Sequence, residues 1–299
     1  MSGYHGSILM SNQGGIIMKI PSISQRGENT PSSPIRKLAP FAEQAKKAGK
    51  HVFHLNIGQP DIETPPSFFK AVDEYHENVL AYNPSNGIPE LLDGMASYYQ
   101  GVGLSHIQKE DIMVTTGGSE AVLFGMMAVT SPGDEIIAFE PFYPNYNGFS
   151  KMAGIDIVPV GTDPSTGYHL PSRKKIEAKI NGKTRAILIC TPNNPTGTIL
   201  SEEELTLLRD IALEHNLFII SDEVYREFAF ETTPRSILSF PDLEQHAIVT
   251  DSISKRYSSC GARIGAIVSK NSEVMATVLK FGQARLCPPT LEQVGAAAM

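Results

Sequence analysis

Residues 186–225, AILICTPNNPTGTILSEEELTLLRDIALEHNLFIISDEVY, decide the fold. Two short apolar runs, Ala186–Cys190 and Leu217–Ser221, are rich in Ile and bounded by polar turns, so we predict two buried strands. Between them, Glu202–His215 has helical spacing and follows a Ser with capping-box spacing to a Glu. A strand, a helix and a second strand in this order predict two parallel strands in a sheet covered by helices.

The alternation of apolar runs and helical patterns continues on both sides of this unit. Helical patterns lie between several further apolar runs, as at Glu120–Val129 and Arg173–Ile180. We therefore predict an α/β fold with a mostly parallel central sheet flanked by helices, in which ligands bind at the carboxyl ends of the strands. The other predicted strands are Ile112–Thr115, Glu135–Phe139, Ile155–Val160, Ala247–Thr250 and Ile264–Val268.

The two ends of the chain are less regular. We predict an irregular arm over residues 21–35, a helix over Ile35–Gly49 and a short strand over His51–Ile57. Met18 is a second candidate start, which leaves residues 1–17 open between a native segment and an extension. Thr290–Met299 has a helical pattern without a stop signal, so we expect the chain to be a fragment of a longer protein.

Composition narrows the class of protein. Of 299 residues, 41% are hydrophobic and 19% are charged, and the formal charge is −7 without a long Lys/Arg run, which favours a small-molecule partner over nucleic acid or a membrane. The three cysteines form no CxxC pair, so neither a disulfide framework nor a metal site is expected. Neither a signal peptide nor an 18-residue apolar run is present, and we expect a cytoplasmic location.

Two polar stretches after predicted strands could bind an anion and a flat ring. TTGGSEA (residues 115–121) opens a helix, where backbone N–H groups and close approach at glycine suit a phosphate. The alternative is a plain glycine-rich turn, since the stretch matches neither a P-loop nor GxGxxG. EPFYPNY (residues 140–146) offers an aromatic side chain for stacking, or a proline-bounded loop with buried aromatics.

Three further stretches carry groups for acid–base or covalent chemistry. In TPNNPTG (residues 191–197) two prolines fix an Asn side chain, or form a simple turn. SDEVY (residues 221–225) ends an apolar strand with a carboxylate that needs a partner, or with a helix cap. SISKRY (residues 252–257) places a lysine at a strand end ahead of Arg263, where it could be a nucleophile or an ordinary surface lysine.

Together these stretches supply a phosphate anchor, a ring stack, an acid for a pyridine nitrogen, a hydroxyl and an amine, which is the set that pyridoxal 5′-phosphate (PLP) requires. The stretches GGSEA, NNPTG, SDEVY and SISK with Arg263 resemble those of the class I and II aminotransferases, which are fold-type I PLP-dependent enzymes. Aspartate aminotransferase is the best-known member. The resemblance extends from about Ile35 to the end of the chain.

The resemblance implies a role for each matched residue. Lys255 matches the lysine that forms the Schiff base with the cofactor and then moves the substrate proton. Asp222 matches the carboxylate that keeps the pyridine nitrogen protonated, and Tyr225 with Asn194 matches the pair that binds the ring oxygen. Tyr143 matches the stacking aromatic residue, which is often Trp in the family, whereas this chain contains no Trp.

The resemblance also implies the phosphate and substrate contacts. Tyr82 matches a tyrosine that reaches the neighbouring subunit's phosphate, which implies a homodimer. Gly58 matches a loop that touches the substrate carboxylate, together with Asn194. Glu120 is expected to contribute a backbone N–H at most, because its charge opposes a phosphate. The matched phosphate-binding positions are Gly118, Ser119, Glu120, Ser252 and Arg263.

We therefore expect residues 1–55 to form an N-terminal arm and part of a small domain, and residues 56–299 a large PLP-binding domain, so that the small domain is incomplete. The resemblance also implies an arginine of a C-terminal small domain that binds the substrate carboxylate, and we expect it to lie beyond Met299. The expected activity is ping-pong transfer of an α-amino group in amino acid metabolism or biosynthesis, with aspartate and 2-oxoglutarate as the preferred pair. A PLP-dependent lyase or decarboxylase and a PLP-binding regulatory module are the alternatives. Arg285 is interpreted as a helix-surface charge, or as a contact to a second substrate carboxylate.

Overall fold

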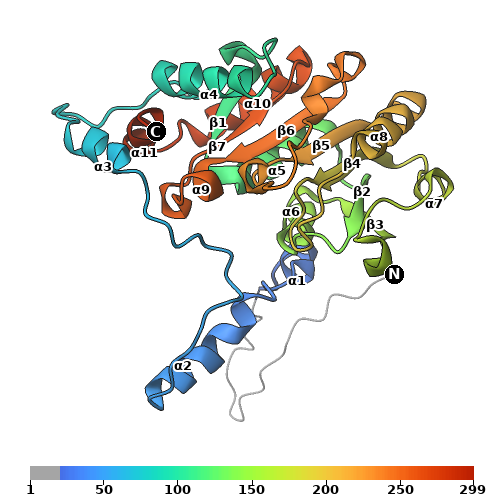
Figure 1. The fold of residues 1–299 in the computed structure, drawn as a ribbon, viewed down its shortest axis with the longest axis horizontal. Helices are drawn as coiled ribbons and strands as arrows, with labels where there is room; N and C mark the ends of the chain where they lie inside the picture. The colour runs from blue at the N-terminus through green and yellow to red at the C-terminus, as the bar shows by residue number, and fades with distance from the viewer. Residues whose placement is uncertain (1–20) are drawn as a thin grey trace, which may run out of the picture.

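The computed structural model describes residues 21–299, which contain one seven-stranded sheet of order β1-β7-β6-β5-β4-β2-β3 (Figure 1). Strand β7 pairs antiparallel with β1 and β6, and every other pairing is parallel, so the predicted mostly parallel sheet is confirmed. The first 20 residues, which include the open segment 1–17, lie outside the described residues. The strands are β1 (Ile112–Thr115), β2 (Glu135–Glu140), β3 (Asp156–Gly161), β4 (Thr184–Cys190), β5 (Phe218–Asp222), β6 (Ala247–Ser252) and β7 (Gly265–Val268).

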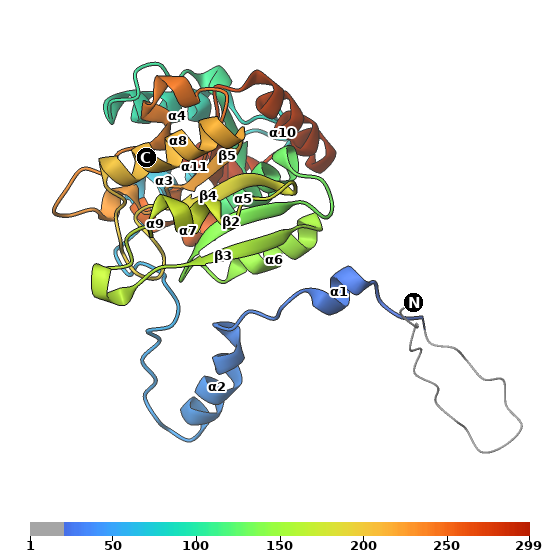
Figure 2. The ribbon, with the colours of Figure 1, turned by 90° about the vertical axis from the view of Figure 1, so that its right-hand side faces the viewer.

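Helices cover both faces of this sheet (Figures 1 and 2). Seven single-turn 3-10 helices lie between the larger elements of the described chain, the first at Arg36–Leu38. The α-helices are α1 (Gln25–Asn29), α2 (Ala39–Lys47), α3 (Pro66–Asp73), α4 (Pro89–Gly101), α5 (Gly117–Val129), α6 (Asn145–Ala153), α7 (Arg173–Glu177), α8 (Glu202–His215), α9 (Ile253–Arg256), α10 (Ser272–Arg285) and α11 (Thr290–Ala297).

The β4–α8–β5 unit forms as its sequence predicts. The Ser201 hydroxyl accepts a hydrogen bond from the Glu204 N–H at 3.2 Å, and the Glu204 carboxylate accepts one from the Ser201 N–H at 2.8 Å. Asn216 ends the helix in the left-handed conformation (φ 51°), which Asn tolerates well. These local signals bring β5 directly alongside β4 and so fix the direction of both strands.

Alternation along the strands divides the core into two layers. Ile219 of β5 is buried in the cluster formed by α4, α7, α8 and α11, whereas Ile220 is buried in the cluster formed by α5, α6 and α10. Complete burial of such a side chain stabilises the fold by roughly 1.5–3 kcal/mol. Both faces of the central strands are therefore apolar, and polar groups are left at the strand ends.

Helix α2 and the extended chain that follows it project from this body (Figure 2). The predicted helix after residue 35 is present as α2, but the predicted strand His51–Ile57 is wrong. Phe53 and Leu55 are 77% and 94% exposed, and no strand pairs with this segment within residues 21–299. Alternating apolar residues are not sufficient for a strand when no neighbouring edge accepts their backbone hydrogen bonds.

The last helix, α11, is part of the body and packs against α3 and α4. Gln293 is fully buried, accepts a hydrogen bond from the Ile88 N–H at 2.9 Å and donates one to the Pro288 carbonyl at 3.0 Å. Over residues 21–299, none of the helices has both the length and the apolar character that a bilayer crossing requires.

Candidate active site

The carboxyl ends of three parallel strands bring most of the predicted site residues together. Cys190, Asp222 and Thr250 are successive partners in the registers of β4, β5 and β6. The stretches that follow these residues therefore start side by side, next to the first turn of α5. This edge is where an α/β sheet of this kind binds ligands.

Asp222 is held at the end of β5 by two hydrogen bonds. One carboxylate oxygen accepts from the Tyr146 hydroxyl at 2.7 Å and the other from the Val224 N–H at 3.3 Å. Desolvation of the carboxyl raises the pKa of Asp222 to about 6, against the lowering effect of both hydrogen bonds and of the Lys255 charge. Such a carboxylate is well suited to face a cationic group of a ligand.

Tyr146 is a site residue that the sequence analysis missed. Its side chain is 1% exposed, and burial together with the Asp222 charge raises the pKa of its hydroxyl far above the ordinary value, so it stays a donor. The sequence feature that could have identified Tyr146 is its position three residues after Tyr143, at the start of a helix. Tyr143 lies just before α6 and Tyr146 lies in its first turn, and it is the Tyr146 hydroxyl that donates a hydrogen bond to Asp222.

Tyr143 lies on the same side of the site. Its ring meets that of Tyr146 edge-on, with 5.5 Å between centroids, and its hydroxyl accepts a hydrogen bond from Asn145 at 2.7 Å. Burial raises the pKa of Tyr143, the Asp222 charge raises it further, and the Arg263 charge lowers it. The Tyr143 ring therefore packs on Tyr146, the residue whose hydroxyl binds Asp222, and its stacking role stays a prediction.

Asn194 and Tyr225, the two residues predicted to bind the ring oxygen, lie side by side. The Asn194 amide donates a hydrogen bond to the Tyr225 hydroxyl at 3.1 Å. Burial raises the pKa of Tyr225 above its ordinary value, so the phenol keeps its proton. The pair presents two adjacent hydrogen-bond donors to the site.

Lys255 is carried by α9, directly after β6. Its Nζ donates to the Gly58 carbonyl, lies 3.9 Å from the Cys260 sulfur and lies 6.0 Å from the centroid of the Tyr225 ring. The structure thus brings together the lysine and the glycine that were predicted from segments 197 residues apart. Ser252 caps the short helix by accepting from the Ser254 N–H at 3.1 Å.

Close approach of two backbone segments and an arginine forms a cradle at the start of α5, the stretch for which a phosphate site is predicted. Gly117 has φ 75°, and a Cβ at this position would lie 2.4 Å from Arg263 Nη2. A Cβ on Gly118 would lie 3.5 Å from Ser252 Cβ. Glycine is favoured at residue 117 because a side chain there would be strained by the backbone conformation and would have to displace the Arg263 guanidinium. The guanidinium of Arg263 therefore lies directly against the helix N-terminus.

The Glu120 carboxylate has partners of its own at the start of α5 and on α10, and the expected contribution of its backbone N–H to a phosphate site stays a prediction. One oxygen accepts a hydrogen bond from the Thr116 N–H at 2.7 Å, and the other lies 3.4 Å from Arg285 Nε. Arg285 itself is not the predicted surface charge, because its side chain is only 17% exposed.

Tyr82 is 79% exposed in the described chain, and its hydroxyl takes part in no hydrogen bond to the site residues described above. Its expected role in a neighbouring subunit therefore stays a prediction.

The residues present fit a flat, anionic cofactor with a basic ring nitrogen. In the cradle, Gly117 and Gly118 carry no side chain that would obstruct a ligand. The Arg263 guanidinium and the N-terminus of α5 add positive charge there. Asp222 has a carboxyl whose burial calls for a cationic partner. Tyr143 offers an aromatic ring beside Tyr146, and Lys255 offers an amine.

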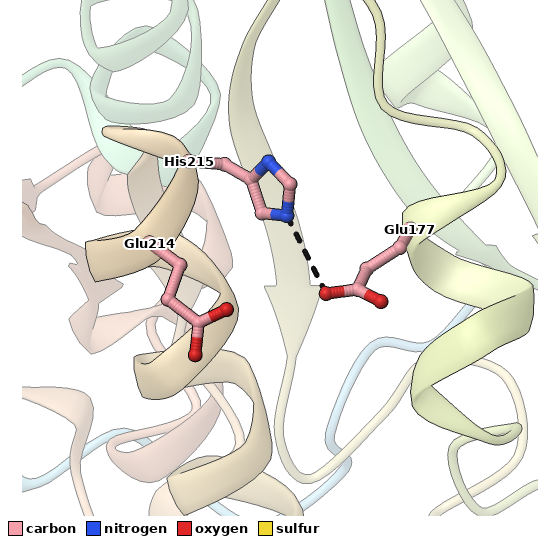
Figure 3. Close-up of side chains that lie close together, drawn as sticks. All are labelled: Glu177, Glu214 and His215. Atoms are coloured by element: carbon pink, nitrogen blue, oxygen red, sulfur yellow. Dashed lines mark hydrogen bonds and ion pairs between the residues drawn. The ribbon is translucent and has the colours of Figure 1, made fainter.

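A second polar cluster lies at the opposite end of the sheet, between α7 and α8 (Figure 3). Glu177, Glu214 and His215 place one ligand atom each within 4.8 Å of the others, and His215 is the last residue of α8, just ahead of β5. Arg173 forms ion pairs with both carboxylates, and the His215 ring lies 3.4 Å from Glu177. The guanidinium binds both carboxylates and offsets part of their charge, so we assign the cluster no metal.

Comparison with known proteins agrees with this geometry. The profile of the family "Aminotransferase class I and II" matches residues 50–299. An aspartate aminotransferase of Thermotoga maritima is 33% identical over 277 residues, covering 92% of this chain and 73% of the relative. One from Sulfurisphaera tokodaii is 31% identical, covering 86% of this chain and 65% of the relative.

Solved structures give the same result. The chain matches the crystal structure of the Thermotoga maritima aspartate aminotransferase with a TM-score of 0.86 at 32% identity, over 92% of this chain and 74% of that one. It matches an alanine aminotransferase of Pyrococcus furiosus with a TM-score of 0.84 at 30% identity, over 93% and 72%. The matched part amounts to 65% and 66% of the length of the curated relatives from Sulfurisphaera tokodaii and Musicola paradisiaca. On its sequence profile, its relatives and its fold, the chain belongs to the class I and II aminotransferase family, with a fold-type I architecture.

Proposed function

We propose that the protein is a PLP-dependent aminotransferase that moves the α-amino group of an amino acid to a 2-oxo acid. The observation that carries this proposal is the placement of Lys255, Asp222 and the Arg263 cradle around one strand edge. When bound, PLP would supply an aldehyde that captures amines and a ring that withdraws electrons from the substrate α-carbon.

The chain's own residues would divide the work as follows. Lys255 Nζ would hold the cofactor and, once released, take the α-proton of the substrate and return it. Asp222 would hold the proton of the ring nitrogen, and its two hydrogen bonds favour the ionised form needed for that task. Asn194 and Tyr225 would donate to the ring oxygen, and Tyr143 would stack on the ring.

The phosphate would be bound by Gly118, Ser119, Ser252 and Arg263, with a backbone N–H from Glu120. Gly58 and Asn194 would contact the substrate carboxylate. Aspartate and 2-oxoglutarate are our preferred substrates. Relatives and neighbours are named for aspartate, alanine, prephenate and kynurenine, and aspartate recurs most often.

We also propose a cytoplasmic enzyme of amino acid metabolism, with residues 56–299 as the large cofactor-binding domain and residues 1–55 as an arm with part of a small domain. The proposed assembly is a homodimer in which Tyr82 reaches the partner's phosphate site. Support comes from the exposed apolar side chains around residues 53–82, which include Leu55 (94% exposed) and Phe53 (77% exposed).

Covalent labelling tests the proposed lysine. The chain is loaded with PLP, reduced with borohydride and digested, and the modified peptide is located by mass spectrometry. We expect the label on Lys255 and its loss in Lys255→Ala, with residual phosphate-anchored binding. Lys179→Ala, an exposed lysine before β4, is the matched control and should keep the label. A label that persists in Lys255→Ala at the same peptide contradicts the assignment.

Product analysis separates the activities that this scaffold allows. With aspartate and no acceptor, an aminotransferase releases about one 2-oxo acid per loaded site and then stops until a 2-oxo acid is added. Release of carbon dioxide or a simple amine would instead indicate a decarboxylase. PLP binding without either product would favour a regulatory module.

A further inference from the structure

Arg285 is a cation next to the phosphate cradle that has no role in the proposed mechanism. It is the last residue of α10, and its Nη2 donates to the Ser85 and Val114 carbonyls at 3.4 Å each. Its Nε and Nη1 are buried and have no hydrogen-bond partner among the described residues. Burying a guanidinium with so few hydrogen-bond partners costs free energy of folding. Such a cost suggests that the charge has a function at this place.

The anion beside it is Glu120, in the first turn of α5. The carboxylate is 3.4 Å from Arg285 Nε, and its other oxygen caps the Thr116 N–H at 2.7 Å. Burial lowers the pKa of Arg285 and the Glu120 charge raises it. The two side chains are 17% and 16% exposed, so solvent screens their charges only in part.

This pair adjoins the place where a phosphate needs positive potential. A carboxylate near a helix N-terminus stabilises the helix, but it also repels a phosphate bound to the same turn. Glu120 follows Ser119 directly, and Arg263 lies against Gly117 on the other side of the turn. Without a nearby cation, Glu120 would cancel much of the charge that Arg263 contributes.

We propose that Arg285 is a charge-compensating residue of the phosphate site: it neutralises Glu120, so that the start of α5 accepts a dianionic phosphate monoester. The inference rests on the proposed function, because that function places the cofactor phosphate at this turn. The competing explanation is a purely structural tie between α10 and α5.

The two explanations predict opposite effects for Glu120→Gln. Glutamine keeps the oxygen that caps Thr116 but removes the charge. If Arg285 compensates Glu120, Glu120→Gln should bind phosphate monoesters several-fold more tightly, and Arg285→Met should bind them about tenfold more weakly. Glu120→Gln/Arg285→Met should return close to the wild type, and Arg285→Lys should retain most of its affinity. A structural tie predicts that both single variants weaken binding together.

Binding is measured on the cofactor-free full chain with pyridoxine 5′-phosphate and with inorganic phosphate as a competitor. Neither has an aldehyde, so attachment to Lys255 does not contribute. Pyridoxine, which lacks the phosphate, should bind all variants equally. Arg173→Met is the matched control, since Arg173 also pairs with glutamates but at the opposite end of the sheet.

Two results would overturn the proposal, and they differ in what else they affect. If the wild type binds pyridoxine 5′-phosphate but Glu120→Gln binds it no better, or pyridoxine shows the same changes, the compensating role is wrong and the proposed function stands. If the wild type binds neither pyridoxine 5′-phosphate nor PLP, the proposed function fails as well.

Discussion

At the scale of single residues, the buried charge of Asp222 lowers the stability of the fold, although the proposed function needs that charge. Its carboxyl is enclosed between β5 and Tyr146, and desolvation raises its pKa from 3.8 to about 6. A difference of about 2 in pKa corresponds to roughly 3 kcal/mol, and we take about 1–3 kcal/mol because the residue keeps some surface exposure. The charge that would serve a cofactor therefore destabilises the cofactor-free protein at neutral pH.

Asp222→Asn should stabilise the cofactor-free protein by about 1–3 kcal/mol at pH 8. Above pH 6 the folded state carries the carboxylate in unfavourable surroundings, whereas the unfolded state carries it in water. As the pH falls toward about 4, both states of the wild type take up the proton, so the difference should shrink towards zero. Urea unfolding at a series of pH values between these limits measures it.

The same variant should lose function. Removal of one preorganised electrostatic contact typically lowers a rate by about a hundred- to a thousandfold. Amino transfer by PLP-loaded Asp222→Asn should fall by that factor, in single-turnover measurements with aspartate. A variant whose stability matches the wild type at every pH, or that transfers at the wild-type rate, would argue against a buried functional carboxylate.

At the scale of elements, the turn from β1 into α5 depends on Gly117. Its φ of 75° favours glycine, and a side chain there would collide with Arg263. Gly133 provides a matched comparison, because its φ is 92° but a Cβ at this position would meet no atom within 4 Å. Both glycines have a positive φ, but only Gly117 has another residue, Arg263, close to its Cβ position.

Gly117→Ala and Gly133→Ala should both lose about 1–2 kcal/mol of stability from backbone strain. Only Gly117→Ala should also weaken PLP binding, by at least about tenfold, since it displaces the guanidinium from the cradle. Thermal unfolding and PLP titration of the two variants separate strain from contact. Equal PLP affinity in both would show that Arg263 is not held by this approach.

At the scale of the whole molecule, the segment before β1 leaves apolar side chains uncovered. Phe53, Leu55 and Leu80 are 77%, 94% and 60% exposed, although the body of the chain buries most of its Leu and Ile residues almost completely. A surface of this kind usually marks an interface. The proposed homodimer offers a partner for it.

Leu55→Asp should therefore shift the protein from dimer to monomer in sedimentation velocity at micromolar concentration. The charge would be buried without a partner at the interface, whereas in a monomer it would meet only water. Leu213→Asp, on the outer face of α8 and 37% exposed, is the control and should leave the sedimentation coefficient unchanged. If Leu55→Asp sediments like the wild type, this segment does not mediate association.

Local sequence alone determined the regular elements and the chemistry at their ends. The sequence predicted the capping box of α8, the apolar runs of β4 and β5, and the polar residues Asp222 and Lys255 at or just beyond strand ends. These features were predictable because helix caps, strand periodicity and the placing of polar residues at strand ends depend on residues close together in the chain. Parallel register then brings those ends together without further information.

Tertiary structure decided the rest. Which tyrosine contacts Asp222 depends on how α6 is rotated against the sheet, so Tyr146 could not be chosen over Tyr143 from spacing alone. The pairing of Glu120 with Arg285 joins α5 to α10, which lie far apart along the chain, and the segment 51–57 became no strand because no edge accepts it. Such features depend on contacts between distant segments, which compete in ways that local propensity does not record.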